Sequence, residues 1–235
     1  MKKTILSSIM SLLFVTSALA TNSGGNSVYI DQTNSDNTSV SITQTGSGNQ
    51  VGDRTNLITP AFVIDGNAMN LNIIQDGMNN TIIGNFIGGD STAAITQTGS
   101  GNIFNLTQGN FGTNSGSMTV NKSGDNNNVE FNMGTSHLTN NYLYNLTITG
   151  NLNNIVSTMN SKYIENNFVV TGNSNNVTTT QIGAHGSPSF AGHKITANII
   201  GDSNAVTITQ NGTTTPNIIT LNVTGSSTTT TITQH

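Results

Sequence analysis

The sequence has no cysteine, no tryptophan and only three prolines among its 235 residues. Because no disulfide bond can form, backbone pairing has to hold the fold together. Charged residues make up 7% of the chain and hydrophobic residues 33%, whereas ordinary globular domains have about 25% charged and about 45 to 50% apolar residues. The composition is therefore not that of a typical enzyme.

Charge is also too scarce for an ordinary disordered chain. Disordered chains of low hydrophobicity usually carry a high net charge, but the net charge here is -4. Without Lys2 and Lys3, four basic residues remain against ten acidic ones, a net charge of -6. Asparagine and threonine contribute 38 residues each. Short alternating runs of Asn, Gln, Thr, Ile and Val with so few charges are typical of cross-β stacking.

The first segment of the chain has the pattern of a secretory signal peptide. Lys2 and Lys3 precede an apolar run that starts at Ile5, and the segment ends in Ala18-Leu19-Ala20. The run is too short for a membrane-spanning helix, and no other segment approaches the roughly 20 apolar residues that such a helix needs. The sequence predicts a signal peptide over 1–20, a mature chain from about Thr21, and export from the cell.

One string, Gln-Thr-Gly-Ser-Gly-Asn, occurs twice, at 44–49 and at 97–102. It belongs to a looser motif, Gly-x-x-Asn-x-(Val/Ile/Phe), that recurs at spacings of 22 to 31 residues, with a worn copy at Gly225 in which Thr228 replaces asparagine. A recurring segment of this length is usually one supersecondary unit that must stack on its neighbours. The predicted repeat turns are Gly46 and Asn49, Gly77 and Asn80, Gly99 and Asn102, Gly124 and Asn127, Gly150 and Asn153, Gly172 and Asn175, and Gly201 and Asn204.

Apolar and polar residues alternate on either side of these turns. Val40, Ile42 and Gln44 precede Gly46, for example, and equivalent runs flank the other turns. Alternation bounded by Gly and Asn indicates strand, turn and strand, because these two residues reach positive φ at low cost. The sequence therefore predicts an all-β solenoid of about eight strand-turn-strand repeats over 39–235, after an N-terminal segment and first strand over 21–38.

In such a solenoid, equivalent side chains lie above one another at about 4.8 Å. Apolar side chains then form inward columns between two facing sheets, while an amide bonds the copies above and below because it carries both a donor and an acceptor. The amides that we expect to stack are Gln44, Gln75, Gln97, Gln108, Gln181, Gln210 and Gln234.

The segment from Gln97 to Gln108 resembles a curlin repeat, the unit of the subunits of bacterial curli fibres. Curlin repeats carry Gln-x-Gly-x-Gly-Asn, then an Ala two residues later and a second Gln four residues after that. Here Gln97, Gly99, Gly101 and Asn102 are followed by Phe104, in place of Ala, and by Gln108. The resemblance covers most of the mature chain, but in later repeats the first Gln is replaced by Lys122, Ile148, Val170, Ile199 and Val223.

The resemblance implies a secreted structural subunit of an amyloid-like fibre at the bacterial cell surface, for adhesion and biofilm matrix. It also implies an outer-membrane secretion pore, chaperone-like partners and a nucleator subunit. The residues themselves predict the polymer, because the uncharged run 229–234 and the run 28–32 are strand-like ends without the lysines or prolines that usually guard sheet edges. A head-to-tail contact between them need not close, so it yields fibres.

Three alternatives remain open or are disfavoured. The chain also fits the nucleator of such a fibre, or a monomeric secreted adhesin or ice-binding protein, although the repeats place threonine irregularly. A polysaccharide-degrading enzyme would need paired carboxylates, and the acids are scattered singly. His137, His185, His193 and His235 lack the spacing of a metal site. We expect no enzyme activity, cofactor or nucleic-acid partner.

Two long intervals interrupt the repeats. The stretch 50–67 contains Arg54 and Pro60, and the stretch 183–194 contains Pro188. Proline cannot donate a hydrogen bond to a central strand. Both stretches are predicted to loop out of the stack.

Overall fold

The computed structural model describes eleven stretches of the chain, and every regular element in them is a β-strand. The predicted signal peptide lies outside these stretches except for Val15–Thr16, and no helix in the described part is long and apolar enough to span a membrane. The described residues are 15–16, 25–33, 37–52, 62–65, 69–87, 92–108, 117–132, 143–160, 165–182, 194–211 and 218–234.

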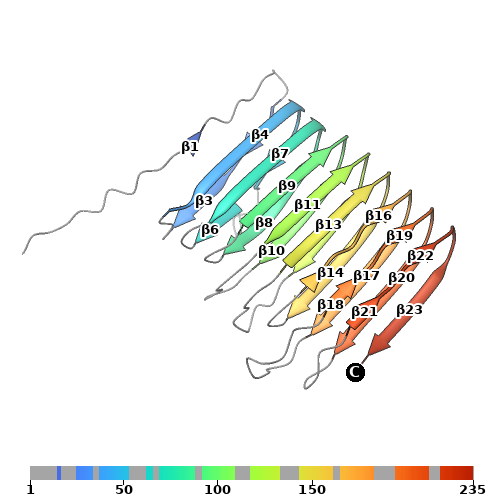
Figure 1. Ribbon diagram of the computed structural model, residues 1–235. Helices are drawn as coiled ribbons and strands as arrows, with labels where there is room; N and C mark the ends of the chain where they lie inside the picture. Colours follow the sequence, from blue (N-terminus) through green and yellow to red (C-terminus); the bar gives the residue numbers. More distant parts are fainter. Residues whose placement is uncertain are drawn as a thin grey trace, which may run out of the picture.

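The strands form two sheets that run the length of the molecule (Figure 1). The first, called sheet A here, has twelve strands: β1 (Val15–Thr16), β4 (Ser39–Ser47), β7 (Asn70–Met78), β9 (Thr92–Thr98), β11 (Met118–Ser123), β13 (Leu143–Thr149), β15 (Glu165–Asn166), β16 (Val170–Thr171), β18 (Lys194–Thr196), β19 (Ile199–Ile200), β21 (Ile218–Thr220) and β22 (Val223–Thr224).

The second, called sheet B, has eleven strands: β2 (Ser27–Val28), β3 (Ile30–Thr33), β5 (Gln50–Val51), β6 (Phe62–Asp65), β8 (Thr81–Ile87), β10 (Ile103–Gln108), β12 (Asn128–Asn132), β14 (Asn154–Asn160), β17 (Asn176–Ile182), β20 (Ala205–Asn211) and β23 (Thr229–Gln234).

The chain alternates between the sheets: one strand of sheet A, or two short ones such as β15 and β16, leads through a turn into sheet B. We call one such unit a coil. Strands of successive coils pair in parallel and in register, as β4 does with β7 and β17 with β20. Eight turns join sheet A to sheet B in this way, from the one at Gly46 to the one at Gly225. The predicted all-β solenoid is confirmed.

The core lies between the two sheets, where every second side chain points inward. In sheet A, Ile42, Ile73, Ile95, Val120 and Leu146 form one buried column through the pairing of β4, β7, β9, β11 and β13. In sheet B, a facing column runs from Val51 to Val206. The strict alternation of the sequence therefore becomes one apolar face for each sheet, as period-two patterns require.

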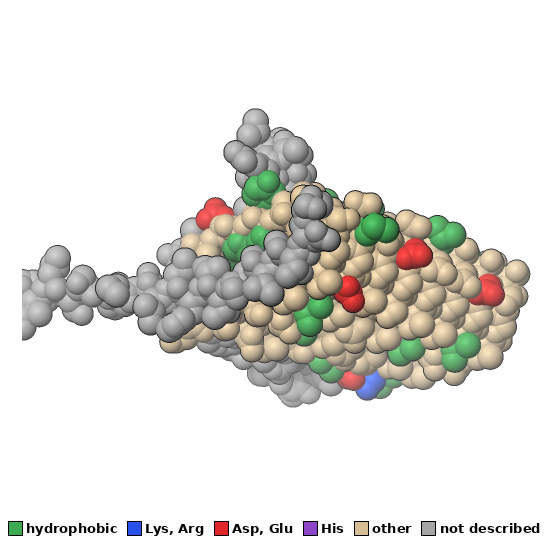
Figure 2. Space-filling model, turned by 90° about the horizontal axis from the view of Figure 1, so that it is seen from above, with side chains coloured by type: hydrophobic (Ala, Val, Ile, Leu, Met, Phe, Trp, Pro, Cys, Tyr) green, Lys and Arg blue, Asp and Glu red, His purple; other side chains and the backbone are tan. Residues whose placement is uncertain are grey.

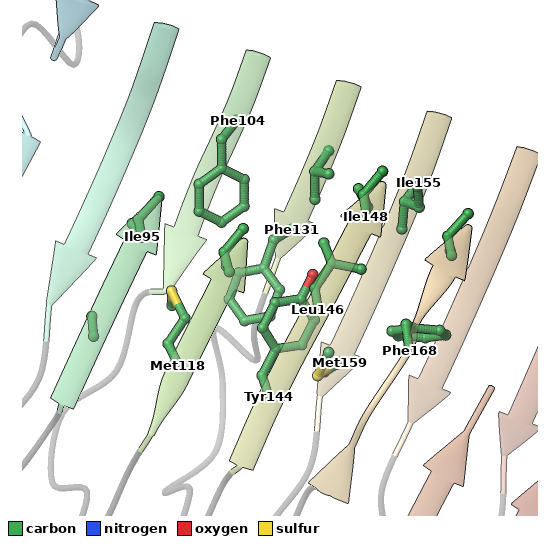
Figure 3. Packing of buried hydrophobic residues seen from close by; sticks show 14 of the residues in the cluster. Ile95, Phe104, Met118, Phe131, Tyr144, Leu146, Ile148, Ile155, Met159 and Phe168 are labelled. Carbon is green, nitrogen blue, oxygen red and sulfur yellow. The ribbon is translucent and has the colours of Figure 1, made fainter. Parts of the chain in front are cut away.

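Aromatic side chains fill the middle of the stack (Figure 3). The ring of Phe131 lies 4.3 Å from that of Tyr144 and 6.5 Å from that of Phe104, centroid to centroid. All three side chains are fully buried. Rings in neighbouring coils thus pack against one another at tilted angles, which aromatic pairs prefer to a face-to-face arrangement.

The prediction that 50–67 loops out as a whole is wrong at both ends. Gln50 and Val51 form β5, while Phe62–Asp65 forms β6, which pairs with β3 and β8 in sheet B. The reason is apolar alternation after the proline, because Phe62 and Ile64 fill core positions and are fully buried. Residues 53–61, with Arg54 and Pro60, lie outside the described residues.

In the second predicted loop, 183–194, only Lys194 belongs to the described residues. It is the first residue of β18 and pairs with Glu165, so the prediction is wrong for Lys194. The two side chains form an ion pair of 2.9 Å on the surface. Pairing to oppositely charged Glu165 on the neighbouring strand keeps Lys194 within sheet A.

Candidate functional site

The turns between the sheets depend on glycine at one position. Gly46 has φ of 93° and Gly77 has φ of 126°, and a Cβ atom on Gly46 would lie 2.0 Å from the carbonyl oxygen of Gly77. A side chain at this position would therefore clash with the next coil as well as strain the backbone. The glycines of the other turns stack in the same way, so the recurring glycine of the sequence sets the close spacing of the coils.

Asparagine three residues after each glycine builds a continuous hydrogen-bonded column, called the asparagine ladder here. Asn80 is typical: its Oδ1 accepts hydrogen bonds from the backbone nitrogen and from Nδ2 of Asn102, at 3.1 and 3.0 Å. Its own Nδ2 donates to the Gly99 carbonyl at 2.7 Å. Each amide therefore bonds the coil on both sides of it.

The ladder runs through the whole described stack. It begins at Asn26, whose Oδ1 accepts from the Asn49 backbone, and it ends at Thr228, whose backbone nitrogen donates to Asn204. The asparagines between these ends are buried: Asn49, Asn80, Asn102, Asn127, Asn153, Asn175 and Asn204. All the predicted turn asparagines thus lie in one column, and Asn26 extends it by one coil that the repeat search did not include.

A second ladder, formed by glutamine, occupies sheet A in the first three turns. Gln44 Nε2 donates to Gln75 Oε1 at 2.8 Å, and Gln75 Nε2 donates to Gln97 Oε1 at 3.0 Å. All three side chains are buried. The same column continues in register through Lys122, Ile148, Val170, Ile199 and Val223, where amides are absent.

Lys122 is the unusual member of this column, because it is a lysine and its side chain is nevertheless fully buried. Burial holds its pKa well below the ordinary value of a lysine. Its Nζ donates to the carbonyl oxygens of Ile103 and Asn127 and lies 5.5 Å from the centroid of the Phe104 ring. The sequence showed Lys122 in the glutamine position, but its burial was not predicted.

Three further glutamines stack in sheet B near the C-terminal end. Gln181, Gln210 and Gln234 are register partners, and Gln210 Nε2 donates to Gln234 Oε1 at 3.2 Å. Gln108 pairs through its backbone with Phe86 in the same sheet, but its side chain lies outside the described residues. The predicted stacking amides thus fall into two sets on opposite sheets.

From the turn at Gly99 onward, the residue after the turn glycine forms an outer ladder that sequence reasoning missed. The Ser100 backbone nitrogen donates to Asp125 Oδ1 at 2.7 Å, and that of Asp125 donates to Asn151 Oδ1 at 2.7 Å. The series continues through Asn173 and Asp202 to Ser226. The signal in the sequence is a short oxygen-bearing side chain after glycine. In this outer ladder each backbone nitrogen donates to a side chain of the following coil, whereas in the asparagine ladder it donates to a side chain of the preceding coil.

The two ends of the stack are incompletely covered. At the C-terminal end β23 is the last strand of sheet B, and at the N-terminal end β2 and β3 are the first (Figure 1). Val28, Ile30 and Ile232 belong to these strands and are only partly buried, whereas equivalents inside the stack such as Val51, Phe62 and Ile208 are buried. The ends thus present apolar side chains and strand edges together.

The described residues hold no cluster of three or more His, Cys, Asp or Glu side chains that could bind a metal. Among the residues that the structure describes, Lys194 and Glu165 form an ion pair and the other surface charges stand singly, as acidic side chains in Figure 2 do. His137, His185, His193 and His235 lie outside the described residues.

Comparison of the sequence with protein-family models gives no match, and comparison with curated proteins gives none either.

Proposed function

We propose that this protein is the subunit of an extracellular amyloid-like fibre, in which copies stack end to end along the solenoid axis. The observation that carries the proposal is the parallel, in-register stack of two sheets, whose end strands have no further strand beside them among the described residues. A sheet edge is a template for another strand. Because the two ends differ, the contact is heterologous and propagates into a filament instead of closing into a dimer.

The residue types of the terminal strand, β23, support this proposal. The sequence of β23 is Thr-Thr-Thr-Ile-Thr-Gln, without charge or proline. Soluble proteins usually protect an edge strand with lysine, proline or a bulge. Segments of high β-propensity and low charge are also the ones that stack in cross-β fibres.

The place of the fibre follows from the N-terminal sequence and from the likeness to curlin repeats. A signal peptide over 1–20 delivers the chain out of the cytoplasm, and a curli-like route uses an outer-membrane pore, chaperone-like partners and a nucleator. The fibre then serves adhesion and biofilm matrix at the cell surface. Its surface is mostly uncharged, with scattered single acidic side chains (Figure 2), which suits repeated contacts with hydroxyl-rich polymers that also present uncharged hydrogen-bonding groups.

The proposal is tested with the chain from Thr21 onward, refolded at micromolar concentration. We expect light scattering to rise after a lag, filaments in the electron microscope, and fibre diffraction with spacings of about 4.8 and 10 Å. A chain that stays monomeric for days without cross-β diffraction overturns the proposal. A chain that stays monomeric but shortens the lag of another subunit acts as a nucleator.

A second candidate function is supported by one surface of sheet B. In the last coils the outward side chains of β17, β20 and β23 are threonines in register, Thr178 beside Thr207 and Thr231, and Thr180 beside Thr209 and Thr233. Threonine placement is irregular over the sequence as a whole, yet it is regular here. The array repeats at about 4.8 Å across strands and about 6.7 Å along them, which makes a regular lattice of hydroxyl groups. It fits an ice-binding protein or adhesin.

The two candidates are separated by ice recrystallisation and thermal hysteresis, measured on the monomeric chain before any fibre forms. Ice binding predicts an effect that Thr207→Lys removes, because a lysine disrupts the flat array. Thr43→Lys is the matched control, since Thr43 is exposed on β4 in the other sheet. No effect on ice growth by the unaltered chain rules this candidate out.

A further inference from the structure

We call the sheet B part of a coil a half-coil. The first and the last half-coils have their residues in the same register, so that equivalent side chains lie in the same columns along the stack. Ser27 and Val28 of β2 connect through eight strand pairings to Thr229 and Thr230 of β23. The coil next to the first one differs from them by an insertion, because 52–61 separates β5 from β6. The two end segments, 26–32 and 228–234, have no insertion and equal length.

The columns agree along the whole length of these segments. Ile30 pairs with Phe62, and the column of Phe62 continues through Leu106, Phe131 and their successors to Ile232. Gln32 and Gln234 stand two residues after Ile30 and Ile232 on the same strands, so they share the next inward column. Isoleucine thus stands over isoleucine, and glutamine over glutamine, at opposite ends of the molecule.

Resting on the fibre proposed above, we propose that successive copies join through sheet B, with β23 of one copy paired in parallel to β2 and β3 of the next. The register places Thr229 opposite Ser27 and Thr233 opposite Asp31. The partner is a second copy of this chain, and the joint is one half-coil wide.

Backbone hydrogen bonds inside the stack show which groups the joint would satisfy. Ser27 donates to the Asn49 carbonyl at 2.9 Å, and Ala205 donates to the Thr228 carbonyl at 2.8 Å. Each coil of sheet B donates in this way to the next. Continued across the joint, the rule directs the backbone nitrogen of Thr229 to the Asn26 carbonyl of the following copy.

The asparagine ladder also continues in this register. Inside the stack each Asn backbone nitrogen donates to the side-chain oxygen one coil before it, as Asn49 does to Asn26 and Thr228 does to Asn204. At the joint, Asn26 of the next copy meets Thr228, whose hydroxyl oxygen accepts the same hydrogen bond. Threonine at the end of the ladder thus keeps the acceptor that the next coil needs.

The glutamine and isoleucine columns complete the match. Gln234 accepts from Gln210 through Oε1, so its Nε2 is left for the coil beyond, where Gln32 supplies an amide oxygen. Ile232 and Ile30 are only partly buried at the two ends. Stacking one on the other removes apolar surface from water on both copies, which favours association.

At the N-terminal end, sheet A begins one coil further along the stack than sheet B. The strands of sheet A in adjacent copies therefore do not meet, and the joint forms through sheet B alone. β4 belongs to the same coil as β5, one level further along than β2 and β3. Within the described residues the strand beside β4 at this end is β1, Val15–Thr16, inside the predicted signal peptide. When β23 meets β2 and β3, β22 and β4 of adjacent copies therefore remain a strand apart.

Cysteine pairs test the register, because the chain has no cysteine of its own. Three double variants of the chain from Thr21 onward are polymerised and then oxidised: Ser27→Cys with Thr229→Cys, Asp31→Cys with Thr233→Cys, and Asp31→Cys with Thr229→Cys. The first two bring paired Cα atoms to about 4.8 Å at the joint, within disulfide reach. The third leaves them about 13 Å apart. Within one copy the pairs lie about 38 Å apart, so they cannot close on themselves.

We expect covalent ladders on non-reducing gels from the first two variants and monomers from the third. Ladders from the third variant, or monomers from all three despite normal fibres, overturn the proposed joint while fibre formation stands. Absence of fibres in the unaltered chain contradicts the fibre proposal itself. Dimers from a single variant, Thr229→Cys alone, indicate a symmetric contact and also overturn the joint.

Discussion

Gln97 and Lys122 are register partners on the neighbouring strands β9 and β11, and both side chains are fully buried. The glutamine ladder of sheet A therefore ends against a buried amine. An amide both donates and accepts, whereas an ammonium group only donates. Lys122 keeps two carbonyl acceptors, Ile103 and Asn127, but its burial opposes its charge.

Replacing this amine is expected to stabilise the fold. Lys122→Gln extends the ladder from Gln97 by one coil and removes an amine whose protonation is opposed by burial, so the unfolding free energy should rise by about 1 to 3 kcal/mol. Urea unfolding of the monomeric chain at pH 7 measures the change. Lys194→Gln is the control on a half-exposed lysine, with an effect within about 1 kcal/mol. Equal or lower stability of Lys122→Gln contradicts the interpretation that burial of the charge is costly.

The same lysine predicts a pH dependence. Because the pKa of Lys122 is lowered in the folded state, the unfolded chain binds more protons between that pKa and about 10.4. Stability therefore rises with pH through this window. We expect the difference in unfolding free energy between the unaltered chain and Lys122→Gln to become smaller from pH 7 to pH 10. The pKa of Tyr144 is raised by burial, which lowers stability above pH 10 in both proteins and cancels in the difference. A constant gap is the contrary outcome.

Tyr144 carries a buried hydroxyl that has no hydrogen-bond partner among the described residues. Its ring packs against Phe131, so Tyr144→Phe keeps the packing and removes only the oxygen. The unfolding free energy should stay the same or rise by about 1 kcal/mol. Tyr144→Leu, which loses the ring contact, should lower it. A clear loss of stability in Tyr144→Phe means that the hydroxyl is bonded.

The asparagine ladder predicts a large cost for a small deletion. Asn102→Ala leaves the Asn127 backbone nitrogen and the Gly124 carbonyl without their side-chain partners. Buried groups without partners cost about 1 to 3 kcal/mol each, so the urea midpoint should fall clearly. The matched control is Asn121→Ala, an exposed asparagine of β11. Similar midpoints for the two variants would show that the ladder adds little stability.

The repeat spacing and alternation were enough to predict the solenoid, because turn glycines and inward columns follow from local rules. Two features could not be predicted in this way. Phe62 and Ile64 rejoin sheet B after an insertion, and only their place between β3 and β8 makes that favourable. The burial of Lys122 likewise depends on its neighbours in space, since the sequence shows a lysine where solvent exposure is the rule.

The outer ladder and the match between the two ends were also beyond sequence reasoning. Ser, Asp and Asn after a turn glycine are common for local reasons, so their bonds to the next coil need coordinates. The shared columns of 26–32 and 228–234 emerge only when the insertion before Phe62 is assigned to its place in sheet B. Sequence periodicity therefore located the repeats, while their register needed the structure.

A proline in β23, the last strand of sheet B, tests fibre elongation separately from folding of the single chain. In the hydrogen-bonding pattern of sheet B, the backbone nitrogen of Thr229 faces the end of the stack, whereas Ala205 already bonds to Thr228. Thr229→Pro removes a donor that only an incoming copy uses, and proline is tolerated on edge strands. We expect an unchanged circular dichroism spectrum and urea midpoint, but at least a tenfold slower rise of thioflavin fluorescence. Thr229→Val, which keeps the donor, should elongate at the normal rate. Normal elongation of Thr229→Pro would mean that copies do not add at β23.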